Sequence, residues 1–253
     1  MPRDEASPPR VGRRIAALVR HGHFDRPSDM PSAHLPTPLS ARGRDQARAA
    51  ARTILEQVES LGAELDERLE SSQLLRAHET ATVLASALRE LTGRTFEVED
   101  RMELLERGLG SCANLTFGEI AATLARDPRL GPLPPEWRRI PDFRLPVPGA
   151  ESLLEAGART AARLRASLDE VAGDAGSDRV RLFVAHGGCL RHAAVHLGAL
   201  EVGTVSRFTM DYAQAIYLER RSDTEWVKVA GDWVSRAARS APVTADDRGT
   251  VQR

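Results

Sequence analysis

The chain has 253 residues, of which 42% are hydrophobic and 28% are charged, and its formal net charge is −1. The length suits one large α/β domain, and the balanced charge argues against a whole-molecule attraction to nucleic acid or to an acidic membrane surface. The two cysteines, Cys112 and Cys189, are too few and too distant for a disulfide framework or a zinc knuckle, so we expect a reducing compartment, the cytoplasm.

The two ends of the chain differ in composition from the rest. Residues 1–12 and 240–253 are polar and lack periodicity, which predicts flexible segments around a single domain at 13–239. The first 12 residues lack the apolar core of a signal peptide, and no apolar run of 18 residues follows. We therefore expect neither secretion nor a membrane span.

Strand-like and helix-like segments alternate in the first part of the domain. Ile15–Val19 is a continuous apolar run, which is typical of a strand buried on both faces. Apolar residues at helical spacing then predict a helix between Ser40, a suitable N-cap, and Gly62, a suitable stop. The next predicted elements are a strand at Leu65–Ser71, a helix at Ala77–Leu91 and a strand at Thr95–Val98.

The segment at about 108–148 is irregular and is called the excursion below. It contains a predicted helix at Phe117–Arg126. The prolines from Pro128 to Pro148 prevent long regular elements, so we expect a lid or a surface excursion here.

Regular alternation resumes after the excursion. The predicted elements are a helix at Ser152–Val171, a strand at Val180–Ala185, a helix at Leu190–Leu197, and strands at Ser206–Met210, Ala213–Leu218 and Trp226–Ala230. This order predicts an α/β fold, a three-layer α/β/α sandwich with a mainly parallel central sheet. The last strands would complete the sheet, some of them antiparallel.

A histidine and a glycine directly follow two of the predicted strands. His21 and Gly22 end the first apolar run, and His186 and Gly187 end the run at Val180–Ala185. Open α/β folds collect their ligands at the carboxyl ends of parallel strands, and glycine allows the backbone to turn sharply there. We therefore expect both imidazoles to face one crevice.

Six segments, taken in order, resemble the histidine phosphatase superfamily, also called phosphoglycerate mutase-like. They are Leu18–Gly22, Thr37–Ala47, Ser71–Ala81, Leu105–Gly110, Pro148–Ser152 and Ala185–Gly188. The tripeptide Arg-His-Gly alone recurs by chance, whereas six segments in the family's order across most of the chain are specific. The resemblance implies the phosphoglycerate mutase-like fold.

The resemblance also implies phosphoryl transfer through a phosphohistidine on His21. In-line attack on phosphorus needs one neutral imidazole nitrogen and several fixed positive donors. Arg20 and Arg76 would bind the phosphoryl oxygens through forked hydrogen bonds, and His186 would donate another. Gly187 would also contact the substrate. This arrangement requires no metal and no cofactor, and the other histidines match no common metal-ligand spacing.

The departing oxygen must receive a proton, so a carboxylic acid is expected opposite the nucleophile. Glu106 is the predicted donor, and as a carboxylate it would then draw a proton from the water that hydrolyses the phosphohistidine. Glu103, three residues earlier, and Glu151, in the second acidic motif, are the alternatives.

The reaction itself has three interpretations. Phosphoglycerate mutases of the family carry Glu-Ser and a nearby Trp-Asn after Arg-His-Gly, where this chain has His23–Pro27, and they carry asparagine where Gly188 stands. These differences favour a phosphomonoester hydrolase over a mutase. A catalytically silent module that binds phosphorylated ligands or partner proteins is the other alternative, and the presence of both histidines and both arginines disfavours it.

Substrate choice depends on the residues at the entrance. His23, Arg26 and Arg107 are the predicted substrate-binding residues, together with Phe24 and the segment Trp137–Phe143. An arginine-edged pocket suits a small phosphorylated sugar, acid or nucleotide. A phosphoprotein is the alternative, because one branch of the family acts on phosphoproteins. The sequence does not indicate the oligomeric state.

Overall fold

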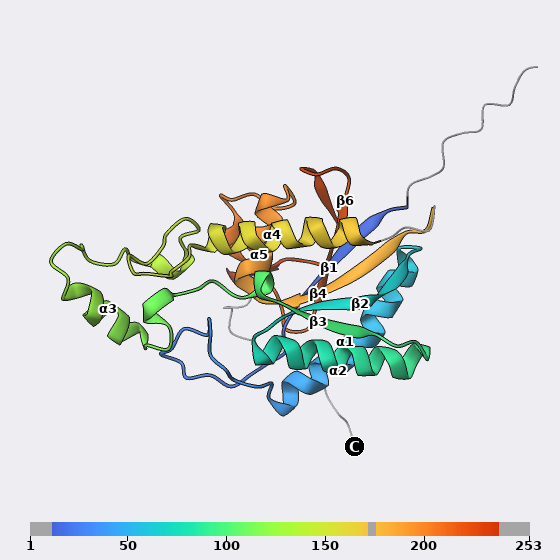
Figure 1. Cartoon of the computed structure of the whole chain (residues 1–253), viewed down its shortest axis with the longest axis horizontal. Helices are drawn as coiled ribbons and strands as arrows, with labels where there is room; N and C mark the ends of the chain where they lie inside the picture. The colour runs from blue at the N-terminus through green and yellow to red at the C-terminus, as the bar shows by residue number, and fades with distance from the viewer. Residues whose placement is uncertain (1–11, 172–175, 238–253) are drawn as a thin grey trace, which may run out of the picture.

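A six-stranded sheet forms the centre of the computed structural model, which describes residues 12–171 and 176–237 (Figure 1). The strands are β1 (Arg14–Arg20), β2 (Glu64–Ser72), β3 (Glu97–Arg101), β4 (Arg179–Ala185), β6 (Ala215–Arg220) and β7 (Trp226–Ala230), in the order β3-β2-β4-β1-β6-β7. The first four pair in parallel, while β6 and β7 are antiparallel. The mainly parallel sheet is confirmed; the predicted flexible ends, apart from Gly12, lie outside the described residues.

Helices cover both faces of this sheet. Because side chains alternate along a strand, Ile15 and Val19 of β1 pack on one face in a cluster with α1 (Ala41–Ser60) and α2 (Leu75–Thr92). Leu18 packs on the other face, in a cluster with α4 (Leu153–Glu170) and α5 (Gly187–His196). The three-layer sandwich is therefore confirmed. No helix among the described residues is long and apolar enough to cross a membrane.

Helix α1 is held directly against the loop that follows β1. The Ser40 hydroxyl caps the helix by accepting a hydrogen bond from the Gly43 backbone N–H at 3.1 Å. A Cβ at Gly43 would lie 2.0 Å from the His23 carbonyl oxygen, and a Cβ at Gly22 would lie 2.5 Å from the Gly43 carbonyl oxygen. Two glycines thus allow the two backbones to touch, which fixes the loop after His21.

Two helices begin earlier than predicted. Helix α2 starts at Leu75, two residues before the predicted start, so Arg76 lies in its first turn. Helix α5 starts at Gly187 rather than at Leu190, and His186 is its N-cap residue. Glycine has a low helix propensity, so a Gly-Gly pair gives no sequence signal for a helix start.

The prediction that Ser206–Met210 forms a strand of the central sheet was wrong. Val205–Arg207 is a 3₁₀ turn, and only β5 (Phe208–Thr209) is extended. It pairs with β8 (Val234–Ser235) in a separate two-stranded sheet. Arg191 holds the carbonyl oxygens of Val205 and Phe208, so contacts outside the central sheet fix this segment.

The excursion has a small core of its own and extends to one side of the sandwich (Figure 1). Its helix α3 (Phe117–Ala125) confirms the predicted helix and begins with a capping box between Thr116 and Glu119. The buried side chains of this core are Ala33, Leu109, Cys112, Ile120, Leu124, Trp137, Leu145 and Ala150. The excursion is therefore an ordered wall beside the sheet.

We predict that Gly43→Ala lowers the free energy of unfolding by about 1–3 kcal/mol, because the added methyl collides with the His23 carbonyl group. Urea denaturation measures this change as a lower midpoint with an unchanged slope. Gly118→Ala is the matched control, since a Cβ there meets nothing within 4 Å on helix α3. It should leave stability unchanged or raise it by up to about 1 kcal/mol. Equal effects of the two substitutions would contradict the backbone contact.

Candidate active site

The parallel pairing of β1 with β4 brings the two strand-end histidines together. Arg20 lies opposite Ala185 in the register, so His21 and His186 leave the sheet as neighbours. Their ring centroids are 5.1 Å apart, and the side chains are 3% and 1% exposed. The backbone N–H of His21 donates to the Ala185 carbonyl oxygen at 2.9 Å. The structure thus places both imidazoles at one end of the sheet.

The surroundings of His21 fix its tautomer. Its Nδ1 lies 2.8 Å from the Gly22 carbonyl oxygen, which can only accept, so Nδ1 carries the proton. Its Nε2 then holds a lone pair and has no hydrogen-bond partner among the described residues. Burial, followed by the charges of Arg20 and Arg76, lowers the pKa of His21 well below its ordinary value. His21 is therefore a neutral imidazole with a free nucleophilic nitrogen.

Arg76 is fixed by acceptors on three sides. Its guanidinium donates to the carbonyl oxygens of Ala33 at 3.0 Å and Leu35 at 3.1 Å, and to Nδ1 of His186 at 3.1 Å. The side chain is 1% exposed, and burial lowers its pKa to about 10, so the group stays cationic at neutral pH. Arg76 is a pre-positioned positive charge beside His21.

Both ring nitrogens of His186 contact protein groups. Because Nδ1 accepts from Arg76, Nε2 carries the proton and donates to the Ser72 hydroxyl at 2.8 Å. Burial lowers the pKa of His186 well below its ordinary value. In this state His186 orients Arg76, and the hydrogen bond from His186 to a substrate stays a prediction. Sequence reasoning assigned no role to Ser72, although it is a polar residue directly after the strand predicted at Leu65–Ser71.

Glu106 lies at the N-terminus of helix α5. Its carboxylate accepts hydrogen bonds from the backbone N–H groups of Gly188 at 2.9 Å, Cys189 at 3.0 Å and Arg107 at 3.0 Å. The first N–H groups of a helix lack partners within the helix, and those of α5 fix the position of this side chain. A Cβ at Gly188 would lie 2.3 Å from Oε1 of Glu106. The absence of a side chain at Gly188 thus leaves room for this carboxylate.

The two alternative acids lie elsewhere. Glu151 accepts from the Gly108 N–H at 2.9 Å and forms an ion pair with Arg159 at 2.9 Å. The Glu103 side chain is exposed, and only its carbonyl oxygen is bound, by Arg159 and Thr160. Of the three carboxylates, Glu106 is the one that lines the cavity in front of His21.

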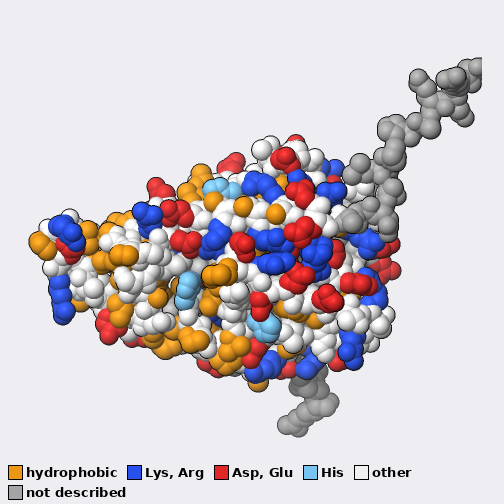
Figure 2. All heavy atoms as spheres, viewed as in Figure 1, with side chains coloured by type: hydrophobic (Ala, Val, Ile, Leu, Met, Phe, Trp, Pro, Cys, Tyr) orange, Lys and Arg blue, Asp and Glu red, His pale blue; other side chains and the backbone are white. Residues whose placement is uncertain are grey.

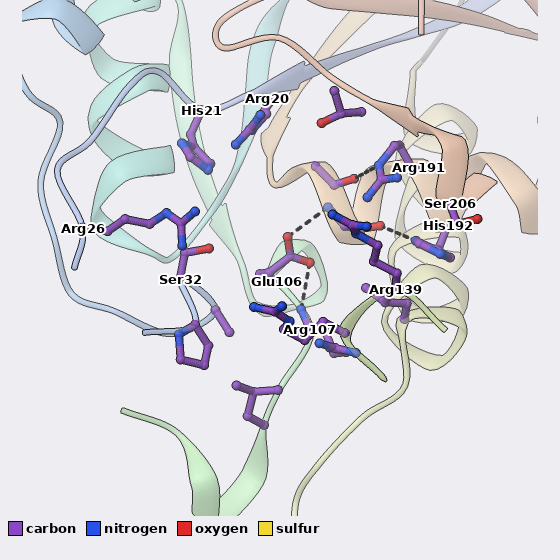
Figure 3. Close-up of a pocket in the computed structure, with 18 of the residues that line it drawn as sticks. Arg20, His21, Arg26, Ser32, Glu106, Arg107, Arg139, Arg191, His192 and Ser206 are labelled. Carbon is purple, nitrogen blue, oxygen red and sulfur yellow. Dashed lines mark hydrogen bonds between the residues drawn. The ribbon is translucent and has the colours of Figure 1, made fainter. Parts of the chain in front are cut away.

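This cavity has a volume of about 560 Å³ and is strongly cationic (Figure 3). Glu106 is the one acidic side chain among the described residues that line it, whereas eight of them are arginines. They are Arg20, Arg26, Arg76, Arg107, Arg138, Arg139, Arg191 and Arg236. The outer face in Figure 2, by contrast, mixes basic and acidic side chains. The excess of positive charge in the cavity therefore favours the binding of an anion.

Most of the predicted substrate-binding residues line the cavity. Arg20, Arg26, Arg76, Arg107 and Gly187 do so. His23 and His186 do not: Nδ1 of His23 lies 2.8 Å from the Ser40 hydroxyl, at the start of α1, and the ring nitrogens of His186 contact Arg76 and Ser72. Among the described residues, no group of three or more histidine, cysteine or acidic side chains is arranged to hold a metal.

Sequence reasoning missed Tyr212 and Arg191. The Arg20 guanidinium lies 4.0 Å from the centre of the Tyr212 ring and donates to the Met210 carbonyl oxygen at 2.7 Å. Arg191 donates to the carbonyl oxygens of Gly187 at 2.7 Å and Val205 at 3.0 Å. These long-range contacts carry no local pattern, although Arg191 lies one turn after the second His-Gly pair.

Comparisons with known structures agree with this geometry. The chain is similar to a mycobacterial glucosyl-3-phosphoglycerate phosphatase, with 30% identity and a TM-score of 0.62 over 86% of this chain and 98% of that one. A second structure, "Mycobacterial hydrolase 1", is 28% identical, with a TM-score of 0.65 over 86% and 97%. The alpha-ribazole phosphatase of Shigella flexneri shares the fold at 23% identity, with a TM-score of 0.61 over 84% and 93%.

No curated protein matches the chain significantly. The family model described as the histidine phosphatase superfamily (branch 1) matches residues 16–232, which is most of the chain and includes both histidines, Arg76 and Glu106. The chain therefore belongs to branch 1 of the histidine phosphatase superfamily and has the phosphoglycerate mutase-like fold.

Proposed function

We propose that the chain is a metal-independent phosphomonoester hydrolase that acts through a phosphohistidine on His21. The observation that carries this proposal is the neutral His21 imidazole, whose free Nε2 lies in a cavity lined by arginines. Phosphoryl transfer depends on positioning and on positive charge around the phosphoryl oxygens. Arg20 and Arg76 supply that charge here without a metal. Similarity to a glucosyl-3-phosphoglycerate phosphatase supports hydrolysis.

In the first step, Nε2 of His21 attacks phosphorus, a P–N bond forms, and the P–O bond to the leaving group breaks. Arg20 and Arg76 neutralise the phosphoryl oxygens. Glu106 gives a proton to the departing oxygen. That proton arrives with the substrate, because a phosphomonoester has a second pKa of about 6 and binds in part as the monoanion.

In the second step, water attacks the phosphohistidine. The Glu106 carboxylate, which accepts hydrogen bonds from three backbone N–H groups, takes the proton from this water. The P–N bond breaks, and His21 returns to its neutral form. The proton passes from Glu106 to the departing inorganic phosphate, so Glu106 is again a carboxylate. The Gly22 carbonyl group keeps Nε2 aimed at phosphorus throughout, since it holds the Nδ1 proton.

The size of the cavity favours a small phosphorylated metabolite over a phosphoprotein. Pockets for small molecules typically have volumes of about 300–1,000 Å³, and the cavity of about 560 Å³ falls in this range. The wall formed by the excursion adds Trp137 and Leu109 to the lining. A walled cavity of this kind encloses a metabolite more readily than a protein segment.

The proposed phosphohistidine intermediate predicts that a labelled phosphoryl group can be trapped on the protein. Incubation with a labelled phosphomonoester and a rapid quench without acid should leave an acid-labile, base-stable phosphoryl group on His21. The label should disappear in His21→Ala and persist in His78→Ala, which replaces an exposed histidine paired with Asp100. Peptide mapping locates the label. A label on serine or cysteine, or full turnover by His21→Ala, would contradict the mechanism.

The proton donor predicts a dependence on the leaving group. Glu106→Gln should lower kcat/KM for an alkyl phosphate by roughly 10²–10⁴-fold, because an alkoxide needs a proton to depart. For p-nitrophenyl phosphate, whose phenolate departs unaided, the loss in kcat/KM should be much smaller, since kcat/KM excludes the later hydrolysis of the phosphohistidine. Glu103→Gln, which replaces the exposed alternative acid, is the matched control and should change neither rate. If Glu103→Gln showed the larger loss, the assignment of the donor would be wrong.

The lowered pKa of His21 predicts the acid limb of the pH profile. Protonated imidazole cannot attack, so activity is lost as pH falls through the pKa of His21. Because burial and the two arginines lower that pKa in the free protein, kcat/KM for p-nitrophenyl phosphate should not fall with a midpoint near 6.5 but only at lower pH. NMR titration of the His21 ring in the free protein measures the same value directly. A ring that titrates near 6.5 would contradict this account.

A further inference from the structure

Each of the two arginines beside His21 lies over an aromatic ring. The guanidinium carbon of Arg20 is 4.0 Å from the centre of the Tyr212 ring, and that of Arg76 is 4.8 Å from the centre of the Phe24 ring. Both distances fall within the range of cation–π contacts, which extends to about 6 Å. Neither ring has a part in the two chemical steps of the proposed mechanism.

The same two rings also contact His21. The centroid of the His21 ring lies 5.1 Å from that of Phe24 and 5.7 Å from that of Tyr212. The contact with Phe24 is edge-to-face, with an interplanar angle of 75°. Each ring therefore bridges the proposed nucleophile and one of the two cations, and we call Phe24 and Tyr212 the aromatic pair.

The backbone on both sides of Tyr212 is bound to Arg20. The Met210 carbonyl oxygen accepts a hydrogen bond from the Arg20 guanidinium at 2.7 Å, and the Ala213 N–H donates to the Arg20 carbonyl oxygen at 2.8 Å. Ala213 has a φ of 54°, in the left-handed region that residues other than glycine rarely adopt. Such a backbone conformation persists only where the surrounding contacts hold it. The contacts with Arg20 thus fix the Tyr212 ring over the guanidinium.

Phe24 is held inside the protein, on the loop that follows β1. Its side chain is 4% exposed, and it is not among the residues that line the cavity. The ring therefore contacts Arg76 and His21 rather than lining the entrance.

A neutral ring holds an arginine without neutralising its charge. A carboxylate in the same place would form an ion pair with the guanidinium and compete with a phosphoryl group for its N–H donors. An aromatic ring instead attracts the cation through its quadrupole and covers only the flat face of the guanidinium. The N–H groups lie in the plane of the guanidinium, so they stay directed toward acceptors such as phosphoryl oxygens.

We propose that the aromatic pair positions the two phosphate-binding arginines: Tyr212 holds Arg20 and Phe24 holds Arg76, so that both charges face the phosphoryl group at His21. This inference rests on the proposed function, because it assigns both arginines to the phosphoryl oxygens. Phe24 and Tyr212 are positioning residues, since they act through the arginines.

Binding of inorganic phosphate tests the aromatic pair without requiring catalysis. Calorimetry measures the Kd and the number of sites separately, so unfolded protein lowers the number of sites, whereas a displaced arginine raises the Kd. Tyr212→Leu should raise the Kd by roughly tenfold or more. Phe24→Leu should raise it less, by roughly threefold, because hydrogen-bond acceptors on three sides also hold Arg76. Tyr212→Phe keeps the ring and should bind phosphate as the wild type does.

The outcomes separate this inference from the proposed function. An unchanged Kd in either leucine variant would overturn the role of its ring, and equal losses in Tyr212→Phe and Tyr212→Leu would show that the ring face is not what holds Arg20. A phosphoryl label on His21 in the wild type would still uphold the proposed function in those cases. A wild-type protein that binds no phosphate would contradict the phosphoryl site and this inference together.

Kinetics with a matched control complete the test. For p-nitrophenyl phosphate, kcat/KM should fall in Tyr212→Leu by roughly tenfold or more and be retained in Tyr212→Phe. Phe96→Leu is the control, because Phe96 is a buried ring that lies 5.5 Å from the guanidinium carbon of Arg94 and does not line the cavity. This variant should change neither the Kd nor kcat/KM. Equal losses in Phe96→Leu and Tyr212→Leu would overturn the positioning role.

Discussion

The parallel contact between β1 and β4 is the constraint on which the site depends. These strands lie side by side in the sheet and end together, so two histidines separated by 165 positions in the numbering become neighbours at 5.1 Å. A glycine follows each histidine: Gly22 packs closely against the first turn of α1, and Gly187 is the first residue of α5. The strand ends thus fix the positions of both imidazoles.

Electrostatics then determines the chemical state of those groups. Arg76 is buried with carbonyl and imidazole acceptors but forms no ion pair with a carboxylate among the described residues, so its positive charge is not neutralised. Burial, together with such a charge, keeps His21 and His186 neutral, and the charge attracts an anion. One physical arrangement therefore suits both roles in the proposed mechanism, a neutral nucleophile and a binding site for the phosphoryl group.

Local patterns were sufficient for the fold and for the strand-end residues, because apolar runs, helical spacing and the His-Gly pairs are short-range signals. Local patterns failed where long-range contacts determine the local conformation. Because α5 begins with two glycines, its start was not predicted from the sequence. Its first N–H groups donate to Glu106, which is distant in sequence. The prediction of a sheet strand at Ser206–Met210 was wrong because the conformation of this segment depends on β8 and on Arg191, which binds the carbonyl oxygens of Val205 and Phe208.

The position of Glu106 connects the fold to the proposed hydrolysis. In the proposed mechanism this carboxylate, held by the backbone of α5, accepts a proton from water, which is the step that would separate hydrolysis from transfer to a second substrate. A Cβ at position 188 would lie 2.3 Å from Oε1 of Glu106, so the carboxylate would have to move. Gly188 therefore does more than permit a turn: it leaves the space in which Glu106 meets the N-terminus of α5.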